Sequence, residues 1–215
     1  MRRRTPLAPS GADPFETLRR GARAVLGRDL SEHEGRQFHK YLNLLQKWQR
    51  VHRLVGSAEA EWIVRQVFLD SLLFRRVLPP DARDVLDAGS GAGIPGIPLK
   101  LVEPDLRLTM VESRRRRVSF LSSAIRELSL TGARLIDGRL EELVRTSPDH
   151  FDAVVARCAG DVGYLFGLGA HLVRPGGIVI ASGPPDEHPL PAGHWVTVPG
   201  VIPHENRRFA VYLRP

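Results

Sequence analysis

The sequence predicts an α/β protein with a mostly parallel, seven-stranded sheet, helices on both faces and an N-terminal helical extension. Three observations predict this fold class. Short apolar strand segments alternate with helical segments over residues 84–181, which is typical of βαβ units. A glycine-rich turn follows the first of these strands directly. Before residue 81, the apolar residues recur at helical spacing.

Composition sets the limits on what the chain can be. Its 215 residues, 42% of them hydrophobic, suffice for one α/β core and an additional helical segment. No apolar run approaches the ~20 residues that span a bilayer, and none follows the basic residues 1–4. We therefore expect a cytoplasmic protein without a membrane span, with an organelle transit peptide as the alternative. Cys158 is the single cysteine and the histidines show no paired spacing, so we expect no metal site.

The positive charge comes almost wholly from arginine. The formal net charge is +7, and only Lys40, Lys47 and Lys100 among the 31 basic residues are lysines. Excess positive charge attracts polyanions over a long range, and the guanidinium group hydrogen-bonds phosphate in a forked geometry. We interpret this charge as favouring a nucleic-acid partner. The alternative is that arginine usage only reflects the base composition of the gene.

Three segments follow one another along the chain. Residues 1–13 predict a flexible leader, residues 14–80 a helical segment packed on the core, and residues 81–215 an α/β domain. A second helical stretch is expected over residues 58–77, before two prolines end the helical region. The first helical stretch has apolar residues at i, i+3, i+4 and i+7 spacing, namely Phe38, Tyr41, Leu42, Leu45 and Trp48.

Seven strands are expected in the α/β domain. They are placed at residues 84–88, 107–111, 133–136, 151–156, 178–181, 194–201 and 208–213. Helices are expected between the first five strands, ending near 102 and 173 and covering 114–130 and 139–145. Strands separated by such helices lie parallel, whereas a turn at 203–206 joins the last two.

A glycine-rich loop leads out of the first strand. In Asp87-Ala88-Gly89-Ser90-Gly91-Ala92-Gly93-Ile94-Pro95-Gly96, three glycines stand at alternate positions between a strand and a helix. Glycine lets the backbone turn sharply and approach a ligand closely. The position between a buried strand and a helix therefore indicates a ligand-binding loop rather than a simple tight turn.

Two cofactors compete for this loop. Residues 91–96 also satisfy the G-x-G-x-x-G pattern of dinucleotide sites, which brings a pyrophosphate to the helix N-terminus. A carboxylate at the strand end would repel that pyrophosphate, and Asp87 stands there. S-adenosylmethionine has no phosphate, and Asp87 would attract its ammonium and sulfonium groups. Glu112, after the second strand, can bind ribose hydroxyls in either cofactor. We therefore predict S-adenosylmethionine.

These residues resemble the glucose-inhibited division protein B (GidB, or RsmG) family, the guanine-N7 methyltransferases of bacterial 16S rRNA. The resemblance covers residues 38–183 and is strongest over 87–99, which include an unusual Pro-Gly-Ile-Pro. It implies a class I, Rossmann-like methyltransferase fold, with residues 81–215 as the methyltransferase domain and ribosomal RNA or the small ribosomal subunit as partner. We expect a monomer. Further matches are Phe68-Leu69-Asp70-Ser71-Leu72, Val111-Glu112-Ser113, Val118-Ser119-Phe120-Leu121, Gly138-Arg139-Leu140-Glu141-Glu142 and the strand ending at Arg157.

The candidate site residues combine this resemblance with the loop chemistry. The resemblance implies cofactor contacts at Gly89, Ile94, Leu140, Glu141 and Arg157, and the loop chemistry adds Asp87, Gly91, Gly93 and Glu112. Arg157 ends the fourth strand, where open α/β sheets bind their ligands, and is also the candidate catalytic residue. The alternative for Arg157 is a salt bridge at a strand end. For Glu141 it is a charge that complements the helix dipole.

The chain departs from the family pattern at several positions. In place of Trp-Asn-x-x-x-Asn-Leu-Thr it has Trp48-Gln49-Arg50-Val51-His52-Arg53-Leu54-Val55, and it carries Val67 for His, Cys158 for Ala and Ser182 for Lys. None of these positions is in the glycine loop, so they bear on the substrate more than on the cofactor. Alternatives are therefore a methyltransferase of another RNA or of a small molecule, and a binding module without catalysis.

The motif after the fourth strand narrows the reaction. Guanine N7 has an exposed lone pair, so methylation there needs alignment rather than a general base. Methylation of an exocyclic amine usually comes with Asn/Asp-Pro-Pro-Tyr/Phe, and this chain has Arg157-Cys158-Ala159-Gly160 instead. Cys158 lacks the preceding proline of the enzymes that use a thiolate. We interpret it as a small packing residue, with a nucleophile as the alternative.

A run of four arginines opens the helix after the second strand. Cations at a helix N-terminus oppose the helix dipole, which favours a phosphate partner over a merely solvated face. Arg114 and Arg117 are expected to share one face of this helix. The candidate RNA-binding residues are Arg114, Arg115, Arg116, Arg117, Arg50 and Arg53.

Overall fold

The computed structural model describes residues 13–157, 161–182, 189–202 and 204–215. Seven strands form one sheet in the order β3-β2-β1-β4-β5-β7-β6. The first five are parallel, and β7 pairs antiparallel with both β5 and β6, so the predicted mostly parallel sheet is confirmed. The strands are β1 (Asp84–Ala88), β2 (Arg107–Glu112), β3 (Ala133–Asp137), β4 (Phe151–Ala156), β5 (Val173–Ser182), β6 (His194–Pro199) and β7 (Asn206–Leu213).

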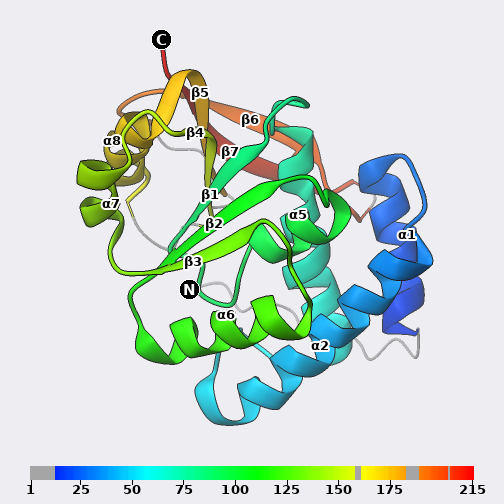
Figure 1. Ribbon diagram of the computed structural model, residues 1–215. Coiled ribbons are helices and arrows are strands. Elements are labelled where there is room, and N and C mark those ends of the chain that lie inside the picture. The colour runs from blue at the N-terminus through cyan, green and yellow to red at the C-terminus, as the bar shows by residue number, and fades with distance from the viewer. Residues whose placement is uncertain (1–12, 158–160, 183–188, 203) are drawn as a thin grey trace, which may run out of the picture.

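Helices cover both faces of this sheet (Figure 1). α7 and α8 lie on one face, and α5 lies on the other together with the N-terminal helices. The helical elements are α1 (Pro14–Leu26), α2 (Glu32–His52), α3 (Ala60–Ile63), the π-helix η1 (Val64–Leu69), α4 (Asp70–Leu72), the 3-10 helix η2 (Leu73–Arg76), α5 (Gly96–Val102), α6 (Arg115–Glu127), α7 (Leu140–Thr146) and α8 (Val162–Leu172).

Two elements differ from the sequence-based expectation. The stretch over 58–77 is broken into four short helical elements, of which η1 has the wider π turn. Val67, Phe68 and Leu69 in this element are all buried, so the wider turn places three consecutive residues in the core. β5 begins at Val173 rather than at residue 178. The backbone hydrogen bonds of Gly176 and Gly177 with Arg214 continue the sheet through the expected turn.

The helical segment shares one hydrophobic core with the α/β domain. Leu18, Phe38 and Phe68 belong to the same buried cluster as Phe120 and Phe209 of the domain. A second cluster lies between the opposite face of the sheet and the helices α7 and α8. The expected core residue Tyr41 is fully buried, and its hydroxyl donates a 2.5 Å hydrogen bond to the carbonyl of Ala92. The N-terminal helices are therefore packed directly against the glycine loop.

Local sequence signals explain where the N-terminal helices begin. The side chain of Asp13 caps α1, with Pro14 in the first turn. α2 begins with a capping box, in which Ser31 and Glu34 exchange side-chain to backbone hydrogen bonds. Arg28 donates to both Glu34 and the carbonyl of Val102, so this helix start is also attached to the end of α5.

Candidate active site

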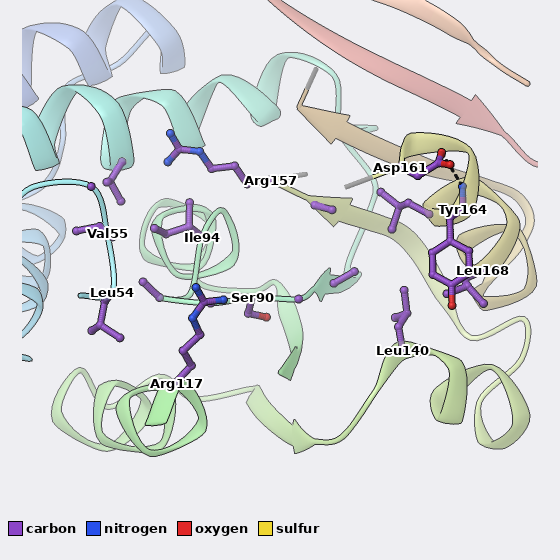
Figure 2. A pocket seen from close by; sticks show the side chains of 18 of the residues that line it. Leu54, Val55, Ser90, Ile94, Arg117, Leu140, Arg157, Asp161, Tyr164 and Leu168 are labelled. Carbon is purple, nitrogen blue, oxygen red and sulfur yellow. Dashed lines mark hydrogen bonds between the residues drawn. The ribbon is translucent and has the colours of Figure 1, made fainter. Parts of the chain in front are cut away.

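A cavity of about 530 Å³ opens at the carboxyl ends of β1 and β4 (Figure 2). The strand order reverses between these two strands, which is where open α/β sheets bind ligands. Its size lies within the range of about 300–1,000 Å³ that is usual for small-molecule sites. Among the described residues, the lining of the cavity comes from the glycine loop, the ends of β1 and β4, the start of α7, the first half of α8, Arg117 of α6, and the connection between α2 and α3 together with Trp62 and Val67.

The glycines after β1 divide into two pairs. Gly89 and Gly91 line the cavity with φ angles of +67° and +61°, which favour glycine. A Cβ on Gly89 would meet no protein atom within 4 Å, so the space above it is open to a ligand. A Cβ on Gly93 would clash with Ile97, and one on Gly96 would lie 2.7 Å from an oxygen of Asp87. The second pair therefore allows the loop to pack tightly at the start of α5.

Asp87 lies beneath this loop rather than at the cavity wall. Its side chain is fully buried, and Oδ2 accepts a 3.0 Å hydrogen bond from the backbone N–H of Gly96. Burial raises the pKa of this carboxyl group to about 7. Neither Asp87 nor Gly93 is among the described residues that line the cavity. The Asp87 carboxyl group therefore does not face the space where the ammonium and sulfonium groups of the cofactor would lie. Its hydrogen bond with Gly96 holds the start of α5 instead.

Glu112, at the end of β2, is tied to the glycine loop. Its side chain is only 5% exposed, and Oε2 accepts a 3.0 Å hydrogen bond from the N–H of Gly91. Oε1 accepts from the N–H groups of Ser113 and Arg114 at 3.0 and 2.9 Å. These three bonds hold the Glu112 carboxylate next to the cavity. The bond from Gly91 also ties the glycine loop to the end of β2.

The four arginines after β2 separate into an exposed group and a cavity residue. Arg114, Arg115 and Arg116 are exposed, whereas Arg117 is half-buried and lines the cavity, with its guanidinium 3.5 Å from Glu112. Figure 2 shows its side chain extending from α6 towards the glycine loop. Of Arg114 and Arg117, only Arg117 lies inside α6, so the expectation that the two share a helical face stays a prediction. The helix begins at Arg115, and Arg114 precedes it with an extended backbone.

A tyrosine and two carboxylates form the wall opposite the α2–α3 connection. The hydroxyl of Tyr164 donates a 2.5 Å hydrogen bond to Oε1 of Glu141, which lowers the pKa of that carboxyl group. Leu140 lies on the same wall. Asp161 caps α8 through the N–H groups of Gly163 and Tyr164. The sequence patterns used above single out neither Asp161 nor Tyr164. The capping preference for Asp could have found the first, but an aromatic residue in an apolar helix gives no such signal.

Arg157 combines both interpretations that the sequence leaves open. It directly follows β4 and lines the cavity, and its Nε lies 3.6 Å from Oδ2 of Asp70, so a salt bridge at the strand end is present as well. Arg157 and Arg117 enter the cavity from opposite sides of Ile94 and Ser90 (Figure 2). Both guanidinium groups thus reach the space between the glycine loop and the helical segment.

The positions that depart from the family pattern fall into different environments. The amide of Gln49 bonds both backbone groups of Val55, donating to the carbonyl at 2.6 Å and accepting from the N–H at 2.9 Å. Val67 is buried and lines the cavity. Ser182 is buried at the end of β5, and Cys158 lies outside the described residues. Arg50 and Arg53 are exposed, directly before the cavity-lining residues 54–56.

Among the described residues, no helix has the length and apolar character needed to cross a membrane. In the same part of the chain, no three His, Cys, Asp or Glu side chains are grouped so that they could hold a metal ion.

Solved structures of methyltransferases share this fold. The chain superimposes with a TM-score of 0.54 on the O-methyltransferase TomG of Streptomyces achromogenes in complex with SAM, at 20% identity over 87% of this chain and 92% of that one. The TM-score is 0.51 for the 16S rRNA N2 G1207 methyltransferase RsmC of Thermus thermophilus, at 22% identity over 68% of this chain and 43% of that one. These likenesses confirm the class I methyltransferase fold.

Two relatives found by sequence share a higher identity with this chain than these two solved structures do. "Ribosomal RNA small subunit methyltransferase G" of Aromatoleum aromaticum is 39% identical over 201 residues, which cover 86% of this chain and 92% of the relative. The protein of the same name from Nitrosospira multiformis is 36% identical over 183 residues, covering 85% and 78%. The family GidB, described as rRNA small subunit methyltransferase G, matches residues 34–183. The chain therefore belongs to the GidB family of ribosomal RNA small subunit methyltransferases.

Proposed function

We propose that this chain transfers a methyl group from S-adenosylmethionine to N7 of a guanine in 16S ribosomal RNA. The proposal rests on the cavity where the strand order reverses between β1 and β4, in a chain of the GidB family. Two glycines with positive φ angles line this cavity. The reaction needs a site for the methyl donor, a route for the guanine and a surface for the RNA backbone. The described residues offer each of these.

The lining of the cavity fits S-adenosylmethionine. Gly89 leaves open space for close approach of the ligand to the backbone. Leu140 and Leu168 give an apolar wall for the adenine ring, and Glu141 beside them can accept a hydrogen bond from its amine. Glu112 is not among the described lining residues, but its carboxylate accepts from the N–H of the lining residue Gly91, and from there it could accept hydrogen bonds from the ribose hydroxyls. When bound, S-adenosylmethionine supplies an electrophilic methyl group on its sulfonium.

Arg117 is suited to the carboxylate of the methionine part. Its ion pair with Glu112 is 3.5 Å long, and none of the side-chain hydrogen bonds found among the described residues uses its guanidinium. Its donors therefore stay available inside the cavity, beside Gly91. A forked guanidinium pairs well with a carboxylate. We accordingly assign Arg117 to the cofactor rather than to an RNA phosphate.

The remaining side chains suit a reaction that depends on alignment. Methylation at N7 removes no proton before the attack, so the protein has to bind, orient and exclude water. Val55, Trp62 and Val67 form an apolar wall from the helical segment. Arg157 lies at the end of β4, and its guanidinium can donate to O6 of a guanine. This would fix the base in the plane that presents N7.

Three exposed arginines mark the surface for the RNA backbone. Arg114, Arg115 and Arg116 lie at the start of α6, next to the cavity residue Arg117. Together with Arg50 and Arg53 they supply positive charge for phosphates, and recognition would follow RNA shape. The proposal places the protein in the cytoplasm, as a monomer without a metal, acting on ribosomal RNA or the small subunit.

Binding and transfer assays test the proposal together. Calorimetry should show that S-adenosylmethionine binds the wild type and that Gly91→Asp abolishes the binding, since the substitution adds a side chain at φ +61° beside Arg117. Labelled methyl groups should then pass to 16S rRNA, free or in small subunits, and be recovered as 7-methylguanine. Transfer to another RNA, or binding without transfer, would contradict the assignment of the substrate.

A further inference from the structure

The helical segment contributes one carboxylate to the neighbourhood of the cavity. Asp70, at the start of α4, has Oδ2 3.6 Å from Nε of Arg157 and Oδ1 2.9 Å from Nε of Arg207. The first two contacts are ion-pair distances, and the hydrogen bond between Arg207 and Asp70 runs from Nη2 to Oδ2 at 3.5 Å. The three side chains come from α4, the end of β4 and β7. Asp70 thus links the helical segment to two strands of the domain.

The three groups are partly protected from water. The exposed fractions of the side chains are 17% for Asp70, 31% for Arg157 and 25% for Arg207. Ion pairs in such positions are screened by salt less than surface pairs are. A guanidinium without a counter-charge at the cavity would repel the ammonium and sulfonium groups of S-adenosylmethionine. Asp70 offsets the charge of Arg157 and also limits where its guanidinium can lie.

Arg207 fixes the carboxylate from the other side. Two of its nitrogens approach the two oxygens of Asp70, and its guanidinium lies 6.0 Å from the ring centre of Phe209, a fully buried residue of β7. The carboxylate is therefore anchored on β7, and Oδ2 is the oxygen that faces Arg157. An acid that is itself held in place can orient a second arginine.

We propose that Asp70 is a positioning residue for methyl transfer, acting through Arg157. This inference rests on the proposed function, because it takes Arg157 to act in the cavity. The helical segment then does more than cover the sheet. It supplies the carboxylate that sets the orientation and the effective charge of the arginine at the end of β4.

The test compares Asp70→Asn with Glu103→Gln. Both remove a carboxylate charge from an ion pair between the helical segment and the α/β domain, since Arg75 lies 2.6 Å from Glu103 outside the cavity lining. A small misplacement of a reacting group can cost about 100-fold in rate. We expect kcat for labelled methyl transfer to 16S rRNA to fall about 10- to 100-fold in Asp70→Asn and to change less than about twofold in Glu103→Gln. Both should show similar losses in unfolding temperature.

Two further variants keep the test decisive if Asp70→Asn folds poorly. Asp70→Glu keeps the charge and should recover part of kcat. Arg207→Gln removes the anchor on β7 and lets the Asp70 carboxylate move, so kcat should also fall, but by no more than in Asp70→Asn. The inference is overturned if Asp70→Asn retains the kcat of Glu103→Gln, or if Arg207→Gln lowers kcat more than Asp70→Asn does. If the wild-type protein transfers no methyl group to 16S rRNA, the proposed function is wrong, and this outcome is distinct from a failure of the Asp70 inference.

Discussion

Gly89 and Gly27 allow the effect of backbone strain to be separated from the effect of cofactor contact. Their φ angles are +67° and +70°, and a Cβ on either would meet no protein atom within 4 Å. Only Gly89 lines the cavity. Replacing either by alanine should reduce the free energy of unfolding by about 1–2 kcal/mol, because a Cβ disfavours this conformation.

Only Gly89→Ala should weaken S-adenosylmethionine. We expect its Kd, measured by calorimetry, to rise more than about tenfold, or about 1.4 kcal/mol, while Gly27→Ala binds like the wild type. Equal affinities in the two variants would mean that the ligand does not approach the backbone at Gly89.

Arg117 and Arg116 are neighbours with different expected partners. Arg117→Gln removes the guanidinium in the cavity and should raise the Kd of S-adenosylmethionine about 10- to 100-fold, as expected for a charge-assisted contact. Arg116→Gln should leave that Kd unchanged and reduce the salt dependence of RNA binding by a slope of about 1. The opposite pattern, with the salt slope changed by Arg117→Gln alone, would return Arg117 to the RNA surface.

The buried Asp87 predicts a pH dependence of stability. Its pKa is raised from 3.8 to about 7, so between these values the folded protein holds a proton that the unfolded chain has lost. The contribution of Asp87 to the free energy of unfolding should therefore fall as pH rises from 4 to 7, by at most about 4 kcal/mol, and then stay level. Asp87→Asn stays neutral and lacks this contribution. Urea titrations without ligand should show that the free energy of unfolding of Asp87→Asn rises relative to that of the wild type between pH 4 and 7. A difference between the two proteins that does not change with pH would contradict the raised pKa.

The pattern of alternate glycines predicts a ligand loop, but it does not say which glycine faces the ligand. Gly89 and Gly93 both have positive φ angles and both follow an alanine. Their roles differ because Ile97 occupies the space beside Gly93, and that packing depends on the tertiary fold. For the same reason the arginine run cannot separate Arg117 from its exposed neighbours. The positive charge of the run predicts the class of partner. Which arginine points into the cavity depends on where α6 begins.

The connection between α2 and α3 forms one wall of the cavity and is held by two glutamines of α2. Gln49 bonds both backbone groups of Val55, and Gln46 donates to the carbonyl of Ala58 at 2.8 Å. Val55 lines the cavity and Ala58 does not. Gln49→Ala should therefore lower kcat/KM for methyl transfer about tenfold through loss of alignment, and speed amide exchange at Val55.

Gln46→Ala is the matched control, since it also removes a bond to this connection. At about 1 kcal/mol of unfolding free energy per hydrogen bond, it should cost about half as much as Gln49→Ala, which removes two bonds, and it should leave kcat/KM unchanged. If both variants lose activity equally, the connection acts through general stability rather than through the position of Val55.

The regular elements of the α/β domain could be predicted because their signals are local. β1 and β4 have the predicted bounds, since an apolar run between turn residues needs no distant contact to be recognised. The division of residues 58–77 into four helical elements could not be predicted. It depends on how Val67, Phe68 and Leu69 pack against the domain. The start of β5 likewise depends on pairing with Arg214, far along the chain.

For the molecule as a whole, the helical segment and the methyltransferase domain form a shared core and a shared site. One hydrophobic cluster spans both, and the segment adds Leu54, Val55, Trp62 and Val67 to the cavity wall. The sequence predicts that the segment packs on the domain, but its part in the cavity appears only in the fold. The departures at Gln49 and Val67 therefore lie in or next to the site, with Gln49 accommodated by its bonds to Val55.

The most direct test of the central claim is a map of 7-methylguanine in 16S rRNA. RNA would be compared from the wild type, from a strain lacking the gene, and from that strain carrying either the wild-type gene or Gly91→Asp. We predict that one guanine loses its N7 methyl group in the deletion strain, regains it with the wild-type gene and does not regain it with Gly91→Asp. An unchanged N7 pattern in the deletion strain would contradict the proposed function.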